Sequence, residues 1–485
     1  MIPAVPGPIA PLDLSTPGRF HVVGVGGPGM SAIALVLAEM GHDVSGSDLR
    51  ELPVLDRLRA AGVDISVGHD RSLVHGVDAV TSSTAIPAHN IELDEAGRTG
   101  VAVLRRAGML ASICAQARSL AVAGTHGKTT TSSMLMLVLV DAGLRPSFVI
   151  GGDVADMGTG AQWTGSEWLV VEADESDLTH VELPLHGTIL TNVDADHLEH
   201  YGTFERIVEC FGQYLAQIPG PKVLCADDPV CDRFAAELAA ESGADRHVVT
   251  YGTAAGATYR VDDVVSGDGG QSFTVVCRGE ELGRVELPLR GIHNVRNAAA
   301  VVAMAREIGV EFDVIARALA RFGGVARRFD IRGTFDGVTL VDDYAHVPAE
   351  IAAVLEAAAT NGDGWRRIVA VFQPNRYRRM AVLSPEYRDA FVRANVTVLT
   401  DIYPSGDEPI PGVSGKLVVN AVLDAHPDQR VVWMPHRSDL AGYLASTLQP
   451  GDVCISMGCG DIAELPAEIL DAAAARGRLT ERGEP

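Results

Sequence analysis

The sequence predicts an α/β protein of several domains, in which apolar strands alternate with helices. Three segments indicate this, because in each an apolar stretch ends in a glycine-rich turn that opens a helix: residues 20–40, 119–142 and 452–461. With 485 residues, 47% of them hydrophobic and 21% charged, the chain is too long for one ordinary core. We therefore expect two to four well-packed domains.

Charge and cysteine content narrow the possible partners. The chain has 39 basic and 63 acidic residues, a net charge of −24, which argues against nucleic acid and anionic membranes. Seven cysteines without CxxC or Cys/His zinc spacing suit a reducing cytosol, and no apolar run is long enough to span a bilayer. We expect a cytoplasmic protein whose residues 1–18 form a disordered extension and not a signal peptide.

The first glycine turn follows a strand predicted over residues 20–25. Gly24-Val-Gly-Gly-Pro-Gly-Met30 opens a helix, and a second strand, residues 43–47, ends in Asp48. This is the formal dinucleotide fingerprint, so the turn could bind NAD(P), bind another nucleotide diphosphate, or be a tight turn without a ligand. A further strand, residues 79–83, ends in hydroxyl-bearing residues that could also face phosphate.

The second glycine turn is Gly124-Thr-His-Gly-Lys-Thr-Thr-Thr131, between a predicted strand at 119–123 and a predicted helix at 132–142. In this arrangement backbone N–H groups and a helix N-terminus face nucleotide phosphates, Lys128 neutralises their charge and the Thr129 hydroxyl reaches Mg²⁺. The general P-loop pattern wants glycine where Val122 stands, so this is a shorter variant. A glycine turn that merely starts a helix is the alternative.

Acidic residues follow two later strands of the same region. The buried run at 168–171 delivers Glu172, and the strand at 187–191 leads to Asn192-Val-Asp-Ala-Asp-His197. Because strand ends converge in open α/β sheets, Lys-Thr, Glu and Asp/His together predict a metal–nucleotide site. A solvated acidic turn would explain Glu175 and Asp177 but not Glu172.

The remaining chain predicts a β-rich insertion at 247–289, an Ala-rich helix at 298–306 and a third α/β unit. The strands of this unit are expected at 338–342, 368–372, 396–400, 431–434 and 452–457. His293 and Asn294 could cap the Ala-rich helix or reach a nucleotide, and the sequence leaves both open. The arginines from Arg376 to Arg379 follow a buried strand directly, which favours anion binding over a solvated face.

Taken together, these motifs resemble the Mur ligase family of ATP-dependent amide-forming enzymes. The resemblance runs from about residue 20 to residue 461 and is carried by ten motifs in the order of the family: GVGGPGM, GTHGKTTT, EADESD, TNVDADHLEHY, GIHNVRNA, GVARRFD, VDDYAHVPAE, FQPNRYRR, YPSGDEPIPG and GCGDI. It implies a UDP-sugar for the first glycine turn, in place of NAD.

The resemblance implies three domains and a reaction. A Rossmann-like N-terminal domain at 19–118 would bind the UDP-sugar, a central P-loop ATPase-like domain with the β-rich insertion at 119–322 would bind ATP, and a Rossmann-like C-terminal domain at 323–485 would bind the amino acid. ATP would phosphorylate the lactyl carboxylate of UDP-N-acetylmuramate, and the amine of L-alanine would displace phosphate from the acyl phosphate. Lysine, arginines and Mg²⁺ would offset negative charge at each step.

The resemblance also implies roles for individual residues. The UDP-sugar site would comprise Gly26, Gly27, Gly29, Met30, Asp48 and Ser83. The ATP site would comprise Gly124, Thr125, His126, Gly127, Lys128, Thr129, Thr130, His293, Asn294, Arg327 and Asp342. Two Mg²⁺ ions, for which Mn²⁺ could substitute, would be held by Thr129, Glu172 and His197. The alanine pocket would comprise Tyr344, His346, Arg376 and Arg379. Lys128, His197 and His346 are the catalytic candidates, with His346 a hypothetical base for the amine.

Some positions depart from the family pattern. No lysine stands between Thr130 and Pro221, so the carbamylated lysine of several Mur ligases is absent. Only one histidine stands in Ala345-His-Val347, and Asn375 replaces a more common histidine.

The rival function is a recycling ligase that adds a murein tripeptide to the same sugar nucleotide, but Ser176 and the Arg376–Arg379 cluster fit alanine better. A dehydrogenase or a non-catalytic nucleotide-binding protein would leave the Lys128 loop or its acidic partners unexplained. Small molecules are the expected partners, and the protein is expected to be a monomer or homodimer.

Overall fold

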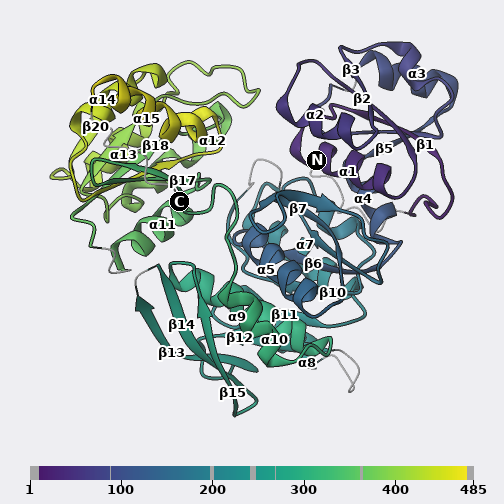
Figure 1. Cartoon of the computed structure of the whole chain (residues 1–485), viewed down its shortest axis with the longest axis horizontal. Coiled ribbons are helices and arrows are strands. Elements are labelled where there is room, and N and C mark those ends of the chain that lie inside the picture. The colour runs from purple at the N-terminus through teal and green to yellow at the C-terminus, as the bar shows by residue number, and fades with distance from the viewer. Residues whose placement is uncertain are drawn as a thin grey trace. The chain divides into compact units, whose positions relative to one another are not determined.

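A computed structural model describes residues 10–87, 89–196, 201–240, 247–267, 269–360 and 364–477. The chain divides into two compact units (Figure 1). The first comprises Met1–Val264, Phe273–Leu287 and Val295–Gly323, and the second comprises Val265–Ser272, Pro288–Asn294 and Gly324–Pro485. Within the described residues, no helix is both long and apolar enough to cross a membrane. The α/β class predicted from the sequence is confirmed.

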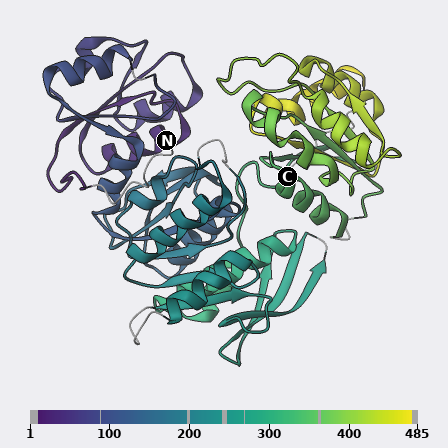
Figure 2. The same ribbon diagram turned by 180° about the vertical axis from the view of Figure 1, so that it is seen from behind.

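The first unit begins with a parallel five-stranded sheet of order β3-β2-β1-β4-β5, coloured purple to blue in Figure 1 and seen from behind in Figure 2. Its strands are β1 (Arg19–Val23), β2 (Asp43–Asp48), β3 (Asp64–Val67), β4 (Ala79–Ser82) and β5 (Ala102–Arg105). Its helices are α1 (Pro28–Glu39), α2 (Pro53–Ala60), η1 (Arg71–Val74), α3 (Ile91–Thr99) and α4 (Arg106–Cys114). Pro28 starts α1, where a missing N–H costs no helical hydrogen bond.

Residues just before this sheet differ from the expected disordered extension. Leu14 is buried, and the Leu12 N–H donates to Ser112 Oγ at 2.9 Å. Burial of an apolar side chain and a backbone hydrogen bond together fix this segment against the domain. The expectation was therefore wrong for residues 10–18, while residues 1–9 lie outside the described part of the chain.

The central sheet has the order β15-β14-β13-β12-β11-β10-β6-β9-β7-β8. Its strands are β6 (Arg118–Ala123), β7 (Ser147–Val154), β8 (Thr159–Gln162), β9 (Trp168–Glu172), β10 (Gly187–Leu190), β11 (Lys222–Cys225), β12 (Val248–Gly252), β13 (Tyr259–Gly267), β14 (Gly270–Cys277) and β15 (Glu280–Leu287). Its helices are α5 (Lys128–Asp141), η2 (Thr179–Glu182), α7 (Phe204–Gln217), α8 (Pro229–Ala240), α9 (Ile292–Glu307) and α10 (Phe312–Ala320). The β-rich insertion predicted from 247 to 289 extends this sheet at one end.

Helix α5 is buried along most of its length. Its side chains from Thr129 to Leu139 are all buried, as expected for a helix whose sequence is apolar or hydroxyl-bearing all round. It packs against β6, β7 and β9 on one side and α10 on the other. The neighbouring strands β6, β9 and β10 are parallel, so their carboxyl ends, which carry the predicted site residues, lie at one edge.

The second unit contains a six-stranded sheet of order β16-β17-β21-β18-β19-β20. Its strands are β16 (Asp330–Phe335), β17 (Val338–Asp343), β18 (Arg367–Phe372), β19 (Val396–Leu399), β20 (Val431–Trp433) and β21 (Asp452–Met457). Its helices are α11 (Pro348–Thr360), α12 (Tyr377–Leu383), η3 (Ser384–Asp389), α13 (Lys416–Ala425), η4 (Arg437–Asp439), α14 (Leu440–Thr447), η5 (Asp461–Glu464) and α15 (Leu465–Ala475).

Both faces of this sheet carry a hydrophobic core. Ala370 and Phe372 of β18 pack with residues of α11, α12 and α13, whereas Val369 and Val371 pack with residues of α14 and α15. Alternate side chains of a strand point to opposite faces, so a strand buried on both faces reads as a continuous apolar run. This is why the strands predicted from apolar runs of the sequence agree closely with the observed strands.

Candidate active site

The turn between β6 and α5 has a backbone that only glycine accommodates. Gly124 has φ of +122°, and a Cβ there would lie 2.2 Å from Thr191 Oγ1. Gly127 has φ of +83°, and a Cβ there would lie 2.8 Å from Asn297 Oδ1. The left-handed backbone and the close neighbours together exclude a side chain at either position. Asn297, on α9, is thus part of the site, a role that the sequence did not assign to it.

The segment after β10 holds this turn in place. Asn192 Oδ1 accepts from the His126 N–H at 2.8 Å, and Asn192 Nδ2 donates to the His126 carbonyl at 3.0 Å. Thr191 Oγ1 donates to the same carbonyl at 2.7 Å. The Asp194 N–H donates to Thr125 Oγ1 at 2.8 Å. The turn is therefore preformed, and Thr191 and Asn192 support it, a role that no sequence motif had indicated.

Lys128 is the first residue of α5 and is nearly buried. Its Nζ lies 2.7 and 3.0 Å from the two carboxylate oxygens of Glu175, and it donates to the carbonyls of Gly124 at 2.7 Å and Thr125 at 3.0 Å. The ammonium group thus lies inside the turn whose N–H groups would meet phosphate, and its charge is balanced by a carboxylate.

The charge of Lys128 is stabilised by its surroundings. Burial by itself would lower the pKa of Lys128, but the negative charges of Glu175, Asp174 and Glu172 outweigh it, and the pKa is raised. Asp174 shows the reciprocal effect: burial would raise its pKa, and the charges of Lys128 and Arg106 lower it. The Lys128 ammonium group therefore stays protonated, as phosphate binding requires.

The alternative of a solvated acidic turn does not hold for Glu175 and Asp177. Glu175 is 3% exposed and faces Lys128. Asp177 Oδ2 accepts from Arg106 Nη2 at 2.8 Å, and Asp174 Oδ2 accepts from the same nitrogen at 3.0 Å. An acidic stretch of sequence looks the same whether its negative charges are solvated or are balanced by buried cations. The tertiary partners decide which of the two occurs.

Arg106 joins two predicted sites within the first unit. It starts α4, directly after β5, and its guanidinium reaches the acidic loop. A Cβ placed on Gly29, in the first glycine turn, would lie 3.2 Å from Arg106 Nη1. The side chain is only 22% exposed. Arg106 therefore lies between the predicted UDP-sugar turn and the predicted ATP site, a position that nothing in the sequence pattern indicated.

Glu172 and Thr129 are the described candidates for holding a metal. Glu172 is the last residue of β9, Thr129 lies in the first turn of α5 after the paired strand β6, and the Gly151 N–H donates to Glu172 Oε2 at 3.0 Å. A carboxylate and a hydroxyl fit Mg²⁺, which binds few protein oxygens and completes its shell with water and phosphate. Among the described residues, no group of three or more His, Cys, Asp and Glu side chains is placed to hold a metal. His197, the third predicted ligand, lies outside the described residues.

The first glycine turn is braced by Asp48. The Gly26 N–H donates to Asp48 Oδ2 at 3.0 Å, and a Cβ on Gly26 would lie 2.8 Å from that oxygen. Gly27 precedes Pro28 and caps α1 in an extended conformation. Asp48 thus shapes the turn from within, whereas the sequence pattern suggested a contact with the ligand.

The other predicted UDP-sugar residues take different positions. The Met30 side chain is 2% exposed and belongs to the core. Ser83 follows β4, and its Oγ accepts from the Ala85 N–H at 3.3 Å. The same loop brings Ile86 against the first turn, because a Cβ on Gly24 would lie 2.7 Å from Ile86 Cδ1. The loop after β4 and the glycine turn therefore lie together.

In the second unit, Arg327 is bound to the ends of two strands. Its Nε donates to Asp342 Oδ2 at 3.0 Å and its Nη2 to the Gly458 carbonyl at 2.6 Å. Arg327 has φ of +62°, a left-handed conformation that is costly for a residue with a side chain. Burial raises the pKa of Asp342, although Arg327 acts in the opposite direction. Within the described residues, Asp342 Oδ1 is buried without a hydrogen-bond partner.

Tyr344 and His346 follow the same strand, β17. The Arg327 guanidinium lies 5.0 Å from the centre of the Tyr344 ring, and the Tyr344 and His346 rings meet edge to face at 5.4 Å. His346 Nδ1 lies 3.2 Å from Glu350 Oε2 and 3.2 Å from the Tyr344 carbonyl. The histidine ring is therefore held in one orientation by its neighbours.

The predicted alanine arginines follow β18. Arg376 has φ of +60°, and Arg379 is 6% exposed, with Nη1 3.4 Å from Asn375 Oδ1. Burial raises the pKa of the Cys459 thiol, whereas the charges of Arg379, Arg327 and Arg376 lower it. The charges of three arginines thus act on this thiol, and one of them, Arg327, contacts the turn after β21 directly. The sequence assigned no role to Cys459.

His293 and Asn294 lie in the first turn of α9. The Asn294 side chain donates to the Arg290 carbonyl at 2.7 Å, and a Cβ on Gly291 would lie 2.4 Å from the His293 ring. Asn297, one turn along the same helix, lies against Gly127. The predicted ATP contact of His293 and Asn294 stays a prediction.

Sequence comparisons identify families for three parts of the chain. A family described as "Mur ligase family, catalytic domain" matches residues 19–118, one described as "Mur ligase middle domain" matches residues 122–305, and one described as "Mur ligase, glutamate ligase domain" matches residues 327–460.

UDP-N-acetylmuramate–L-alanine ligases from two organisms are similar to the chain. The one from Desulforamulus reducens is 41% identical over 457 residues, covering 93% of this chain and 97% of the relative. The one from Rubrobacter xylanophilus is 42% identical over 454 residues, covering 93% and 99%.

Solved structures resemble the fold over nearly the whole chain. UDP-N-acetylmuramate-alanine ligase from Thermotoga maritima has a TM-score of 0.77 at 27% identity and covers 95% of this chain and 100% of that structure. A murein peptide ligase from Psychrobacter arcticus has a TM-score of 0.69 at 23% identity and covers 96% and 100%. The second likeness concerns the fold alone.

Proposed function

The chain belongs to the Mur ligase family, and we propose on this premise that it joins L-alanine to the lactyl carboxylate of UDP-N-acetylmuramate. The reaction consumes ATP, passes through an acyl phosphate and releases ADP and phosphate in peptidoglycan precursor synthesis. The observation that carries this function is 41% identity to an L-alanine ligase over 93% of the chain. The buried Lys128 in its preformed glycine turn supports the ATP-dependent step.

In the first step, a carboxylate oxygen of the substrate attacks the γ-phosphorus of ATP and ADP leaves. The turn N–H groups and Lys128 bind the phosphates, which requires that Glu175 yield its place at the ammonium group. Thr129 and Glu172 would hold Mg²⁺, which when bound neutralises phosphate charge. Asn192 keeps the turn ready for this charge without rearrangement.

In the second step, the alanine amine attacks the acyl carbon and phosphate leaves. Arg376 and Arg379 would bind the alanine carboxylate, because guanidinium groups match its planar geometry. His346, whose Nδ1 lies 3.2 Å from Glu350 Oε2, would accept a proton from the amine. Asp342 Oδ1 has no hydrogen-bond partner among the described residues, and a ribose hydroxyl of ATP would satisfy it. These assignments are proposals, as is the role of Arg327 as an ATP contact.

The same proposal includes the UDP-sugar at the first glycine turn and the cytoplasm as the place of action. Helix α1 directs its N-terminus at this turn, and such an N-terminus attracts phosphate. All seven cysteines are free, which suits a reducing compartment.

Purified protein tests this function against the recycling ligase. Phosphate release with UDP-N-acetylmuramate and ATP is measured after addition of either L-alanine or a murein tripeptide. We expect release with L-alanine, and release with the tripeptide alone would establish the recycling function. Lys128→Ala should reduce the rate by roughly a hundredfold or more, with the exposed Lys416→Ala as the matched control. A normal rate in Lys128→Ala would exclude the proposed phosphate contact.

A further inference from the structure

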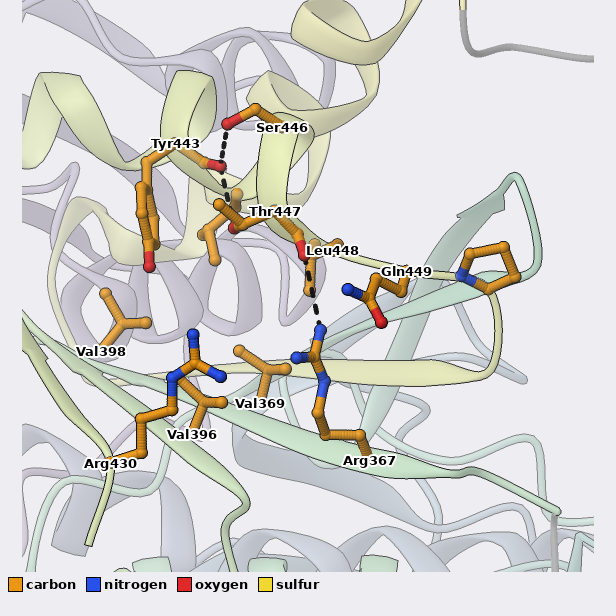
Figure 3. Close-up of a pocket in the computed structure, with 12 residues that line it drawn as sticks. Arg367, Val369, Val396, Val398, Arg430, Tyr443, Ser446, Thr447, Leu448 and Gln449 are labelled. Carbon is orange, nitrogen blue, oxygen red and sulfur yellow. Dashed lines mark hydrogen bonds between the residues drawn. The ribbon is translucent and has the colours of Figure 1, made fainter.

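A pocket of about 450 Å³ lies in the second unit between helix α14 and strands β18 and β19. Figure 3 shows its residues, which come from the amino ends of the two strands and from the end of α14. Its volume is in the range of cavities that bind small molecules. None of the residues predicted for ATP, UDP-sugar or alanine lines it.

The floor of the pocket is apolar. Val369, Val396 and Val398 line it and are nearly buried, with exposed fractions of 3%, 7% and 0%. The Tyr443 ring, from α14, faces these valines across the space (Figure 3). An apolar ligand body would meet the small exposed parts of Val369 and Val396 on one side and the Tyr443 ring on the other.

Two arginines border this floor, and only one of them is neutralised. Arg367 Nε and Nη2 donate to the two Asp452 carboxylate oxygens at 2.9 and 2.5 Å. The Arg430 guanidinium makes no hydrogen bond or ion pair with any residue that the structure describes, and neither does the Tyr443 hydroxyl. Figure 3 shows the Arg430 guanidinium and the Tyr443 hydroxyl directed into the same space. The pocket therefore has one guanidinium, on the exposed residue Arg430, that no carboxylate of the described residues pairs with, in a chain whose net charge is −24.

We propose that this pocket binds a small monoanionic carboxylate with an apolar body. The carboxylate accepts two hydrogen bonds from the Arg430 guanidinium, whose fork matches its geometry, and one from the Tyr443 hydroxyl. The body covers Val369 and Val396. A single unbalanced guanidinium matches a charge of minus one, whereas a phosphate dianion would leave one charge uncompensated beside an apolar floor.

This pocket is separate from the proposed alanine site. Strand β18 runs from Arg367, which borders the pocket, to Phe372, and Arg376 and Arg379 come after its opposite end. Val369 is the pocket residue furthest along this strand, and three steps of ~3.3 Å, roughly 10 Å in all, separate it from Phe372, before the loop that carries the two arginines. The inference therefore does not depend on the proposed ligase function.

Calorimetric titration of the full chain tests the proposal with 3-phenylpropanoate as the probe. Its uncharged amide has the same body without the charge, and acetate has the charge without the body. We expect the acid to bind about tenfold more tightly than the amide, which corresponds to about 1.4 kcal/mol, and acetate more weakly than either, because only the acid combines the charged hydrogen bonds with the apolar body. Equal affinity for acid and amide, or no heat with the acid, would overturn the proposal.

Variants locate the binding. Arg430→Gln should weaken acid binding about tenfold, to the level of the amide, and Tyr443→Phe should weaken it a few-fold. Arg476→Gln, an exposed arginine of the same unit, is the control and should bind the acid normally. Excess L-alanine should leave the titration unchanged. Displacement by L-alanine, or unaltered binding to Arg430→Gln, would place the probe elsewhere and refute the assignment.

Discussion

The Lys128 ammonium and the Glu175 carboxylate form an ion pair in which Nζ lies within 3.0 Å of both oxygens. Both groups are almost buried, with side-chain exposures of 13% and 5%. The carboxylate takes the position at the ammonium group that a nucleotide phosphate would need. ATP binding therefore replaces one anion by another, and the affinity reflects the difference between them.

Glu175→Gln should bind ATP about tenfold more tightly than the natural chain. A neutral amide competes less with phosphate for Lys128, while Asp174 and Glu172 still support the lysine charge. The dissociation constant is measured by calorimetric titration without the other substrates. Glu167→Gln, which removes an exposed partner of Arg118, is the control. Weaker ATP binding in Glu175→Gln would show that the carboxylate assists the nucleotide.

Asn192→Ala should weaken ATP binding by about tenfold while UDP-N-acetylmuramate binding stays normal. The side chain makes two hydrogen bonds to the His126 backbone, and without them the turn must be ordered when ATP binds. Titration of each substrate separates the two effects. Asn395→Ala also removes a side-chain hydrogen bond to backbone, at Ile368 in the second unit, and should keep ATP affinity. An equal loss of affinity for ATP and for UDP-N-acetylmuramate would contradict a role of Asn192 confined to the ATP-binding turn.

Arg106→Lys should raise the KM for UDP-N-acetylmuramate several-fold. Arg106 donates to Asp177 through both Nε and Nη2 and to Asp174 through Nη2, a two-nitrogen geometry that lysine cannot reproduce, and the side chain borders Gly29. Steady-state kinetics at saturating ATP and L-alanine measure the effect, with the exposed Arg118→Lys as control. If only the thermal unfolding midpoint falls and KM is unchanged, Arg106 supports the fold and not the substrate.

His180→Leu should remove an acid sensitivity of the first unit. Burial lowers the pKa of His180 to about 3, and its ring lies among Phe211 and Tyr214 at 5.0 and 5.4 Å. Below the ordinary histidine pKa of about 6.5 the unfolded chain binds a proton that the folded chain excludes, so stability is lost as pH falls. At pH 5 the free energy of unfolding is lower by about 2 kcal/mol for this reason.

Urea unfolding at pH 5 and pH 7.5 measures this sensitivity. The difference between the two pH values should be smaller in His180→Leu than in the natural chain. His75→Ala, at a histidine whose side chain is 57% exposed, should keep the natural difference. An unchanged difference in His180→Leu would show that other groups cause the acid loss.

Much of the fold followed from the sequence because apolar runs mark strands that are buried on both faces. The strand predicted at 452–457 is β21 without change, and the helix predicted to begin at residue 132 begins at Lys128. The glycine turns were also predictable, since Gly124 and Gly127 adopt conformations that other residues avoid.

The rest of the site depended on contacts between distant segments. Asn192 supports His126 across 66 positions of the sequence, and Arg106 meets Asp177 across 71. Neither spacing has a local pattern, so the sequence could not distinguish a solvated acidic loop from a buried one. The metal role of His197 and the alanine roles of Arg376 and Arg379 stay predictions.

Oxygen tracing tests the central claim most directly. UDP-N-acetylmuramate with ¹⁸O in both oxygens of its lactyl carboxylate is incubated with the protein, ATP and L-alanine, and the released phosphate is analysed by mass spectrometry. An acyl phosphate requires one ¹⁸O atom in each phosphate released, because the oxygen that attacks ATP leaves with phosphorus. Phosphate without ¹⁸O, accompanied by amide formation, would contradict the proposed mechanism.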